Sequence, residues 1–220
     1  MSEIPYELVR SRRRTLALVI DGEARLVVRA PLRLGEGVIR DFVRRKARWV
    51  VEKQRQVRDM KGRRGAFVLN DGETVSYLGK SYTLFRRRVG DVTVDDPFMY
   101  VPDGMSLGGF AAWMRERCRG VVGERVAHYA GLMGLDYAAI RMSGARHRWG
   151  SCGAGNTLNF AWRLVMCPPA IIDYVVVHEL SHIPHKGHGA KFWMHVARIL
   201  PRYKEAQAWL RNNRSLLDEI

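Results

Sequence analysis

Two histidines and a glutamate in the segment HELSH have the types and spacing of a catalytic metal site. An α-helix turns by about 100° per residue, so His178 and His182 lie about 40° apart on one helical face. Both imidazoles can therefore reach one ion. Glu179 lies about 60° round from His182, too far aside to be a comfortable ligand but close enough to contact a water on the metal. This geometry predicts a metal ion with a general base beside it.

A catalytic zinc needs a third protein ligand, because it takes three and leaves a fourth position for water. The metal lowers the pKa of that water to about 7. His188 is the favoured third ligand. Pro184 predicts that the helix ends just before it, and Gly187 and Gly189 could take positive φ and let the chain fold back toward the metal. The sequence therefore predicts Zn²⁺ held by His178, His182 and His188.

Two other residues could supply the third ligand. His185 would share the face of His178 and His182 only if the helix continued through Pro184. Glu205 is a distant carboxylate that the fold would have to bring in. The alternative to a metal site is a set of hydrogen-bonded core histidines, but an apolar helix before the motif and further histidines after it favour the metal.

Hydrolysis also needs a donor for the developing oxyanion beside the metal. Arg148 is the first residue of the RWGSC motif and follows His147, and Tyr174 lies one helical turn before His178. We expect the oxyanion donor to be one of these three, and we rank Arg148 and Tyr174 with Glu179 as candidate catalytic residues. Asn159 is a candidate for orienting a ligand histidine from behind.

The composition describes a globular protein of 220 residues, with 47% hydrophobic and 27% charged residues. No apolar signal core or membrane-spanning run is present, so we expect a soluble cytoplasmic protein without a membrane partner. The three cysteines are odd in number and form no CxxC pair, which argues against a disulfide framework. The net charge is +15, and the first 100 residues hold 22 basic and 13 acidic side chains, which favours phosphate-bearing or acidic partners.

The first half of the chain reads as β-rich with one helix. Thr15–Ala30 contains two apolar runs joined by Asp21-Gly22, a strong hairpin signal. Gly35–Met60 has apolar residues at helical spacing with arginines between them, which predicts one amphipathic helix. Phe67–Val101 returns to alternation and predicts several strands. Pro102–Gly104 closes this region.

The second half predicts a helix-rich region around a small sheet. Ser106–Met133 has helical spacing and ends before Gly134, while residues 140–166 predict strands around a turn. The next helix, residues 169–183, carries the HExxH motif and is apolar on most sides, so we expect it to be buried. Ala190–Leu200 and Tyr203–Asn212 predict two closing helices.

These elements predict an α+β fold with two regions. Residues 1–104 would form a basic β-rich N-terminal domain, and residues 105–220 a zincin-like catalytic domain. The boundary is soft, because no long Gly-, Ser- or Pro-rich linker separates the halves, and one compact unit is the alternative.

Several motifs together resemble the YgjP-like zinc metallopeptidases, relatives of the SprT-like group. The C-terminal motifs are RWGSC at 148–152, the following TLNF, DYVVVHELSH, His188 before KFW, and PRYKEAQAWL. The N-terminal ones are a hairpin ending in RAP, then ARWVVEK and YLGKSYTLF. The resemblance covers nearly the whole chain. It implies a β-rich N-terminal half, a zincin-like catalytic half, zinc on the three histidines and Glu179 as base. The chain departs from the family pattern where Gly-His-Gly replaces Asn-His-Ser and where Pro184 and His185 enter the loop.

We therefore expect a zinc-dependent hydrolase, a metallopeptidase acting on peptides or proteins. A metal-dependent nucleotide pyrophosphohydrolase is one alternative, because the arginine surplus could bind phosphates beside the same activated water. A nucleic-acid-associated module with a basic N-terminal half is the other, and its binding would weaken steeply with salt. The sequence does not define the substrate or the oligomeric state.

Overall fold

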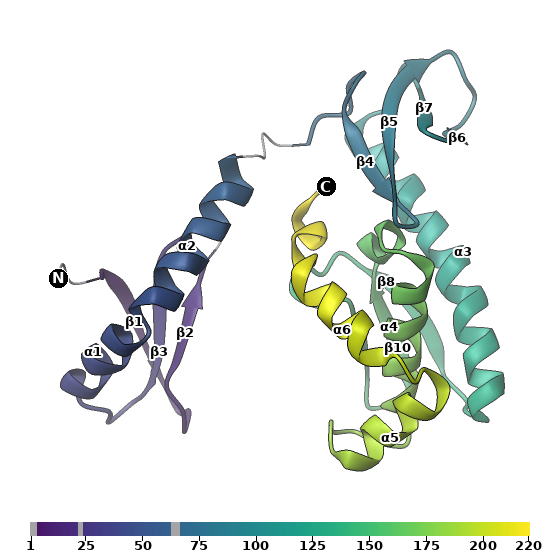
Figure 1. The fold of residues 1–220 in the computed structure, drawn as a ribbon. Helices are drawn as coiled ribbons and strands as arrows, with labels where there is room; N and C mark the ends of the chain where they lie inside the picture. Colours follow the sequence, from purple (N-terminus) through teal and green to yellow (C-terminus); the bar gives the residue numbers. More distant parts are fainter. Residues whose placement is uncertain (1–3, 22–23, 63–66) are drawn as a thin grey trace. The chain divides into compact units, whose positions relative to one another are not determined.

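The computed structural model describes residues 4–21, 24–62 and 67–220, and the chain divides into two compact units. The units are Met1–Ala66 and Phe67–Ile220. Each has its own cluster of buried hydrophobic side chains. The chain is thus a mixed α+β protein, as the sequence predicted (Figure 1).

The first unit is a three-stranded sheet with two helices. Strands β1 (Tyr6–Ser11), β2 (Ala17–Ile20) and β3 (Leu26–Pro31) have the order β1-β3-β2. The predicted hairpin is confirmed by the antiparallel pairing of β2 with β3, although Gly22 at its tip lies outside the described residues. Strand β1 was not predicted, and it pairs in parallel with β3.

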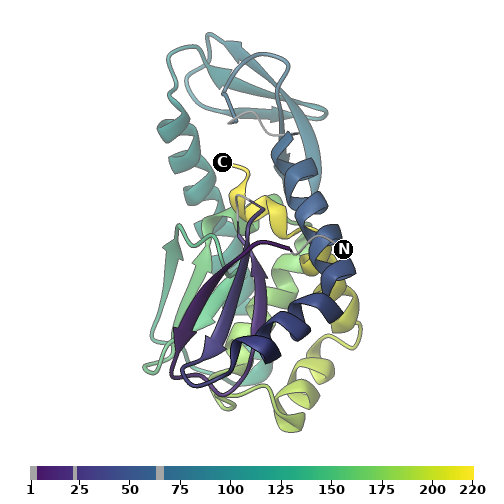
Figure 2. The ribbon, with the colours of Figure 1, turned by 90° about the vertical axis from the view of Figure 1, so that its left-hand side faces the viewer.

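Two helices, α1 (Glu36–Arg45) and α2 (Ala47–Gly62), stand where one was predicted. Alternate residues of β3 are buried together with helical residues, so the helices cover one face of the sheet (Figures 1 and 2). The expectation of a single helix is wrong because Lys46 leaves helical geometry, with φ −99° and ψ 9°. A one-residue interruption leaves the spacing of Ile39, Val43 and Val50 compatible with either arrangement.

The second unit begins with a four-stranded sheet. It contains β4 (Thr74–Tyr77), β5 (Lys80–Arg87), β6 (Thr93–Asp95) and β7 (Phe98–Pro102), in the order β4-β5-β7-β6. Its buried side chains belong to the same core as the helix that follows it, α3 (Leu107–Met133). The boundary that we expected near residue 104 therefore falls inside this unit.

A tight turn of this sheet packs against the start of the helix that carries the HExxH motif. Gly79 has φ +80°, and a Cβ there would lie 2.7 Å from Cα of Pro168. The backbone N–H of Leu78 donates to the carbonyl of Val165 at 2.7 Å, just before that proline. Only glycine permits this close approach with this φ. The turn between β4 and β5 is thus packed directly against the start of the HExxH helix.

A second, smaller sheet lies beside α3. Strands β8 (Ala139–Ser143), β9 (Gly150–Cys152) and β10 (Thr157–Ala161) have the order β8-β10-β9, with β9 antiparallel to β10. The strand predicted to continue to Met166 ends earlier, because Trp162–Met166 forms a 3₁₀ helix, η1. All five of its residues are buried. A run that is buried on every side has no alternation to distinguish strand from helix.

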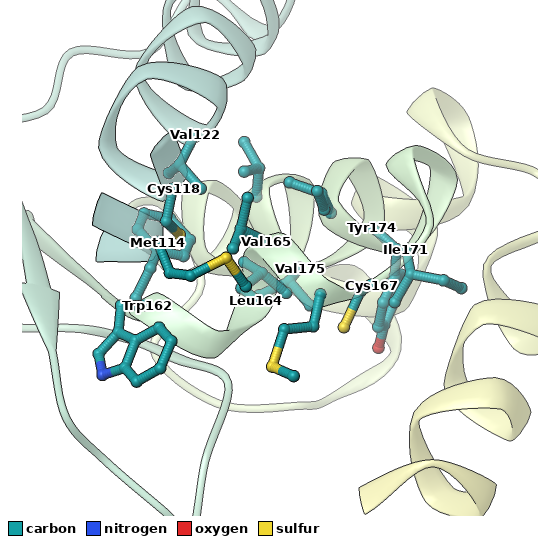
Figure 3. Close-up of a cluster of buried hydrophobic side chains, with 14 of the residues drawn as sticks. Met114, Cys118, Val122, Trp162, Leu164, Val165, Cys167, Ile171, Tyr174 and Val175 are labelled. Carbon is teal, nitrogen blue, oxygen red and sulfur yellow. The ribbon is translucent and has the colours of Figure 1, made fainter. Parts of the chain in front are cut away.

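The HExxH helix, α4 (Pro169–Ser181), lies centrally in this unit, as predicted. Nine of its residues are buried: Ile171, Ile172, Tyr174, Val175, Val176, Val177, Glu179, Leu180 and Ser181. Figure 3 shows part of the cluster, where α4 side chains pack with η1 and α3. Helices α5 (Ala190–Ile199) and α6 (Tyr203–Asn212) and the 3₁₀ helix η2 (Arg214–Asp218) close the unit. Within the described residues, none of the helices has the length and apolar character needed to cross a membrane.

Candidate metal centre

Three imidazoles meet at the C-terminal end of α4. His178 lies in the last turn of α4, His182 caps this helix, and His188 precedes α5. One ring nitrogen from each lies within 4.8 Å of the other two. Nε2 of His178 and Nε2 of His188 are 3.1 Å apart. The structure thus brings together the three residues that the sequence proposed as ligands.

A short loop returns His188 to the end of α4. The helix ends as expected near Ile183, whose N–H donates to Leu180, and the N–H of His185 still bonds to the carbonyl of Ser181. The expected positive φ at the flanking glycines does not occur. Gly189 is extended, with φ −76° and ψ −178°, and Gly187 is not among the described residues with positive φ. The turn is therefore made by the capped helix end rather than by left-handed glycines.

Hydrogen bonds on the far side of two rings fix their orientation. Nδ1 of His182 lies 3.0 Å from the carbonyl of His185, which can only accept, so this nitrogen carries the proton. Nδ1 of His178 lies 3.3 Å from the hydroxyl of Tyr174. The His188 ring stacks on Trp193, with centroids 5.6 Å apart and planes at 28°. These contacts turn Nε2 of His178 and His182 away from their Nδ1 partners, toward the cluster.

The protonation of the rings also suits a metal. Burial, and then the neighbouring His182 and His188, lower the pKa of His178 to about 3. Burial likewise lowers the pKa of His182. A tetrahedral zinc with bonds of 2.0–2.1 Å to nitrogen holds its ligand nitrogens about 3.3 Å apart. The 3.1 Å between His178 and His188 is close to this value. The donor set and its spacing therefore fit a metal ion.

Glu179 lies beside the histidines, with 5% of its surface exposed. Burial raises the pKa of its carboxyl to about 8, although Arg148 and the backbone N–H of Cys152 lower it. A Cβ at Gly150 would lie 2.7 Å from both Cγ and Oε1 of Glu179. Gly150 therefore makes room for this carboxylate. In the sequence, only its place in the RWGSC motif marked Gly150.

The other candidates from the sequence lie in different surroundings. Arg148 is exposed and close enough to Glu179 to lower its pKa. The ring of His185 packs against His195, with centroids 5.5 Å apart, and does not join the cluster. Glu205 is paired with Arg202 on α6. The Asn159 amide donates to backbone carbonyls of its own sheet rather than to a ligand histidine.

Comparisons with known proteins give a family and a distant structural likeness. A comparison with curated proteins gave no match. A solved structure, the crystal structure of the metallopeptidase zymogen of Pyrococcus abyssi abylysin, is 18% identical, with a TM-score of 0.40 over 42% of this chain and 93% of that one. The model of the YgjP-like metallopeptidase domain matches residues 14–213. Because this match spans nearly the whole sequence, the chain belongs to the YgjP-like metallopeptidase family.

Proposed function

We propose that this protein is a zinc-dependent metallopeptidase in which His178, His182 and His188 hold the metal and Glu179 is the general base. Its family is one of metallopeptidases, which supports a metal-dependent peptidase. The observation that carries the finer proposal is the convergence of three imidazole nitrogens within 4.8 Å, with a buried carboxylate from the same helix beside them. Three neutral histidines with an open fourth position are the ligand set of a catalytic zinc.

Glu179 moves the proton in this mechanism. When bound, zinc would acidify a water and polarise the scissile carbonyl. The Glu179 carboxylate takes the proton of the attacking water and passes it to the leaving nitrogen of the peptide bond. A cation nearby favours the ionised carboxylate, which burial alone disfavours. Arg148 is close enough to lower the pKa of Glu179 and is our candidate for stabilising the oxyanion.

We propose that an extended peptide substrate pairs with the edge of the small sheet. Strand β9 is the last strand in the order β8-β10-β9, so one of its edges has no partner strand within the described residues. This strand contacts α4, and Gly150 lies against Glu179. A peptide that pairs with a free strand edge is held by main-chain hydrogen bonds, with little dependence on its sequence. This edge supports a peptide or protein substrate.

The two alternatives from the sequence have less support. Nucleotide hydrolysis would use the same activated water, but the family is one of peptidases. Nucleic-acid binding rests on the basic charge of the N-terminal half alone. Both alternatives, and the cytoplasmic location, stay predictions from the sequence.

The function is tested by comparing wild-type protein with Glu179→Gln. Both proteins would be loaded with zinc, assayed for metal content, and incubated with peptides, unfolded proteins and nucleoside triphosphates, with products identified by mass spectrometry. We expect wild type to cleave peptide bonds, and the variant to keep its zinc and lose turnover. Undiminished turnover in the variant would remove Glu179 from the mechanism, and cleavage of triphosphates alone would replace the peptidase by the nucleotide alternative.

The ligand assignment is tested with two alanine variants from one loop. His188→Ala removes a ring of the cluster, whereas His185→Ala keeps the backbone carbonyl that bonds to His182. We therefore expect a much larger loss of bound zinc in His188→Ala, measured by mass spectrometry of the metal. The reverse order would overturn the assignment of His188 as third ligand.

A further inference from the structure

Tyr174 lies behind the candidate metal, not beside it. It stands one helical turn before His178 on α4, is 5% exposed, and has its hydroxyl 3.3 Å from Nδ1 of His178. The opposite nitrogen of that ring, Nε2, faces His188 at 3.1 Å. The hydroxyl therefore contacts the edge of His178 that points away from the cluster. This position fits a positioning residue better than the oxyanion donor, for which Tyr174 was one of three candidates from the sequence.

The hydrogen bond has a definite direction once His178 binds a metal through Nε2. The remaining proton of a neutral imidazole then lies on Nδ1, which must donate. The Tyr174 oxygen accepts it, so the hydroxyl proton of Tyr174 needs an acceptor of its own. Because Tyr174 is buried, this acceptor should be a protein group.

Helix α6 carries the candidate for that group, Gln207. Burial raises the pKa of the Tyr174 hydroxyl, and the nearby Gln207 side chain opposes this rise. The effect on the pKa corresponds to the NH₂ group of Gln207 facing the Tyr174 oxygen. Turning the amide by 180° exchanges this NH₂ group for the carbonyl oxygen, so Gln207 can accept the Tyr174 proton without rearrangement of the backbone. Polar groups of Gln207 and Tyr174 thus lie between α6 and Nδ1 of His178.

A second contact holds α6 beside the same cluster. Tyr203, one turn before Gln207, stacks on Trp193 with centroids 5.3 Å apart and planes at 13°. Trp193 in turn stacks on His188 at 5.6 Å. Helix α6 is therefore connected to two of the three imidazoles, through polar groups to His178 and through aromatic rings to His188.

We propose that Tyr174 holds His178 in the tautomer that binds the metal through Nε2, and that Gln207 of α6 holds Tyr174 in place. This inference rests on the proposed metal site. Both residues are positioning residues, because they act through His178 and do not contact a substrate. Removing a hydrogen-bond partner behind a ligand histidine typically weakens metal binding by about 10- to 100-fold.

The test compares zinc affinity and histidine tautomers in four proteins: wild type, Tyr174→Phe, Gln207→Leu and Tyr82→Phe. Tyr82 is a matched control, because it is a buried tyrosine of the same unit, 6% exposed, on strand β5. Zinc affinity would be measured by competition with a chromophoric chelator. The tautomer of His178 would be read from ¹⁵N chemical shifts of its ring in the zinc-loaded and metal-free proteins, and unfolding temperature would be recorded alongside.

We expect zinc affinity to fall about 10- to 100-fold in Tyr174→Phe, less in Gln207→Leu, and not in the Tyr82→Phe control. In the metal-free protein, Tyr174→Phe should also lower the population of His178 that carries its proton on Nδ1, which a general loss of stability would not do. Wild-type affinity and an unchanged tautomer in Tyr174→Phe would overturn this inference and leave the metal site intact. A wild-type protein that binds no zinc would instead refute the proposed function itself.

Discussion

Replacing Gly150 by alanine should disable Glu179 without removing the metal. The added Cβ would lie 2.7 Å from Cγ and Oε1 of Glu179 and 2.9 Å from Cδ, whereas ordinary contacts begin at 3.4 Å. The carboxylate or strand β9 must therefore move by about 0.7 Å to restore van der Waals contact. Gly150 pairs with Phe160, which is fully buried, so the strand resists this movement. The Glu179 side chain is then the part that shifts.

A misplacement of about 1 Å in a catalytic group lowers the reaction rate on the order of 100-fold. Forcing extra atoms into a packed region lowers the free energy of unfolding by about 1–3 kcal/mol. We expect Gly150→Ala to lose turnover by roughly this factor while it retains zinc, because the change touches none of the three imidazoles. The assay is peptide hydrolysis at saturating zinc, with metal content and unfolding temperature measured on the same samples.

Gly153→Ala is the matched control, since it lies just after the same strand and its added Cβ would meet only the carbonyl of Thr157 at 3.6 Å. Wild-type turnover in a zinc-loaded Gly150→Ala would refute the argument that Gly150 makes room for the base. An equal loss in both variants would assign the effect to the loop rather than to the clash with Glu179.

Two further predictions concern stability. Gly79 and Gly72 have φ of +80° and +84°, but only at Gly79 would a Cβ overlap a neighbour, Pro168. In both alanine variants the left-handed backbone should lower the free energy of unfolding by about 1–2 kcal/mol. Urea unfolding should show a clearly larger loss for Gly79→Ala, because its Cβ also overlaps Pro168. Equal losses in the two variants would contradict the packing of this turn. Glu179 gives a pH dependence, because burial raises its pKa from 4.5 to about 8, so the metal-free folded state binds this proton more tightly than the unfolded chain does. The contribution of Glu179 to stability should therefore fall as pH rises from 4.5 to 8, by up to about 1.4 kcal/mol per pH unit. His178, whose pKa is lowered from 6.5 to about 3, contributes in the opposite sense below pH 6.5, so the measured quantity is the difference between wild type and Glu179→Gln. Glu179→Gln should remove this dependence and the exposed Glu124→Gln should keep it; parallel curves for wild type and Glu179→Gln would contradict the buried carboxyl.

The helices of the second unit could be predicted from local signals. Helix α3 begins at Ser106, whose side chain accepts from the N–H of Gly109, and ends at Gly134 with φ +62°. Pro169 begins α4, where a missing N–H costs little. Each signal lies within a few residues of the boundary that it marks. Local chemistry therefore placed the helix that carries His178 and Glu179.

Pairings between distant segments could not be predicted in the same way. Strand β1 pairs in parallel with β3, with Tyr6 opposite Leu26, and nothing near Tyr6 identifies that partner. The division into units is a similar case. The turn at Gly79 packs against Pro168, a contact across 89 positions that ties the four-stranded sheet to α4. A boundary near residue 104 looked reasonable because the pattern changes there from strands to a helix.

The candidate site shows the same difference between local signals and contacts of distant segments. His178, Glu179 and His182 lie on one helix, so their spacing alone predicted a common face, and His188 follows within a short loop. Gly150 is 29 positions from the carboxylate that it accommodates, and its role depends on strand β9 lying against α4. The sequence therefore identified the candidate metal ligands and the candidate base. It did not identify Gly150 as the residue that makes room for that base.

Burial of α4 connects these observations. Helix α4 is buried on most sides, so its packing fixes the position of its C-terminal end, which carries His178 and Glu179. The same burial removes water from that end, so His178 stays neutral with a pKa of about 3, while Glu179 holds its proton up to a pKa of about 8. Neutral imidazoles are ready to bind a cation, and a cation is what the buried carboxyl needs before it can ionise and act as a base. In the proposed metallopeptidase, this burial would couple the binding of a metal to the activation of Glu179, which a surface helix with the same five-residue motif would not do.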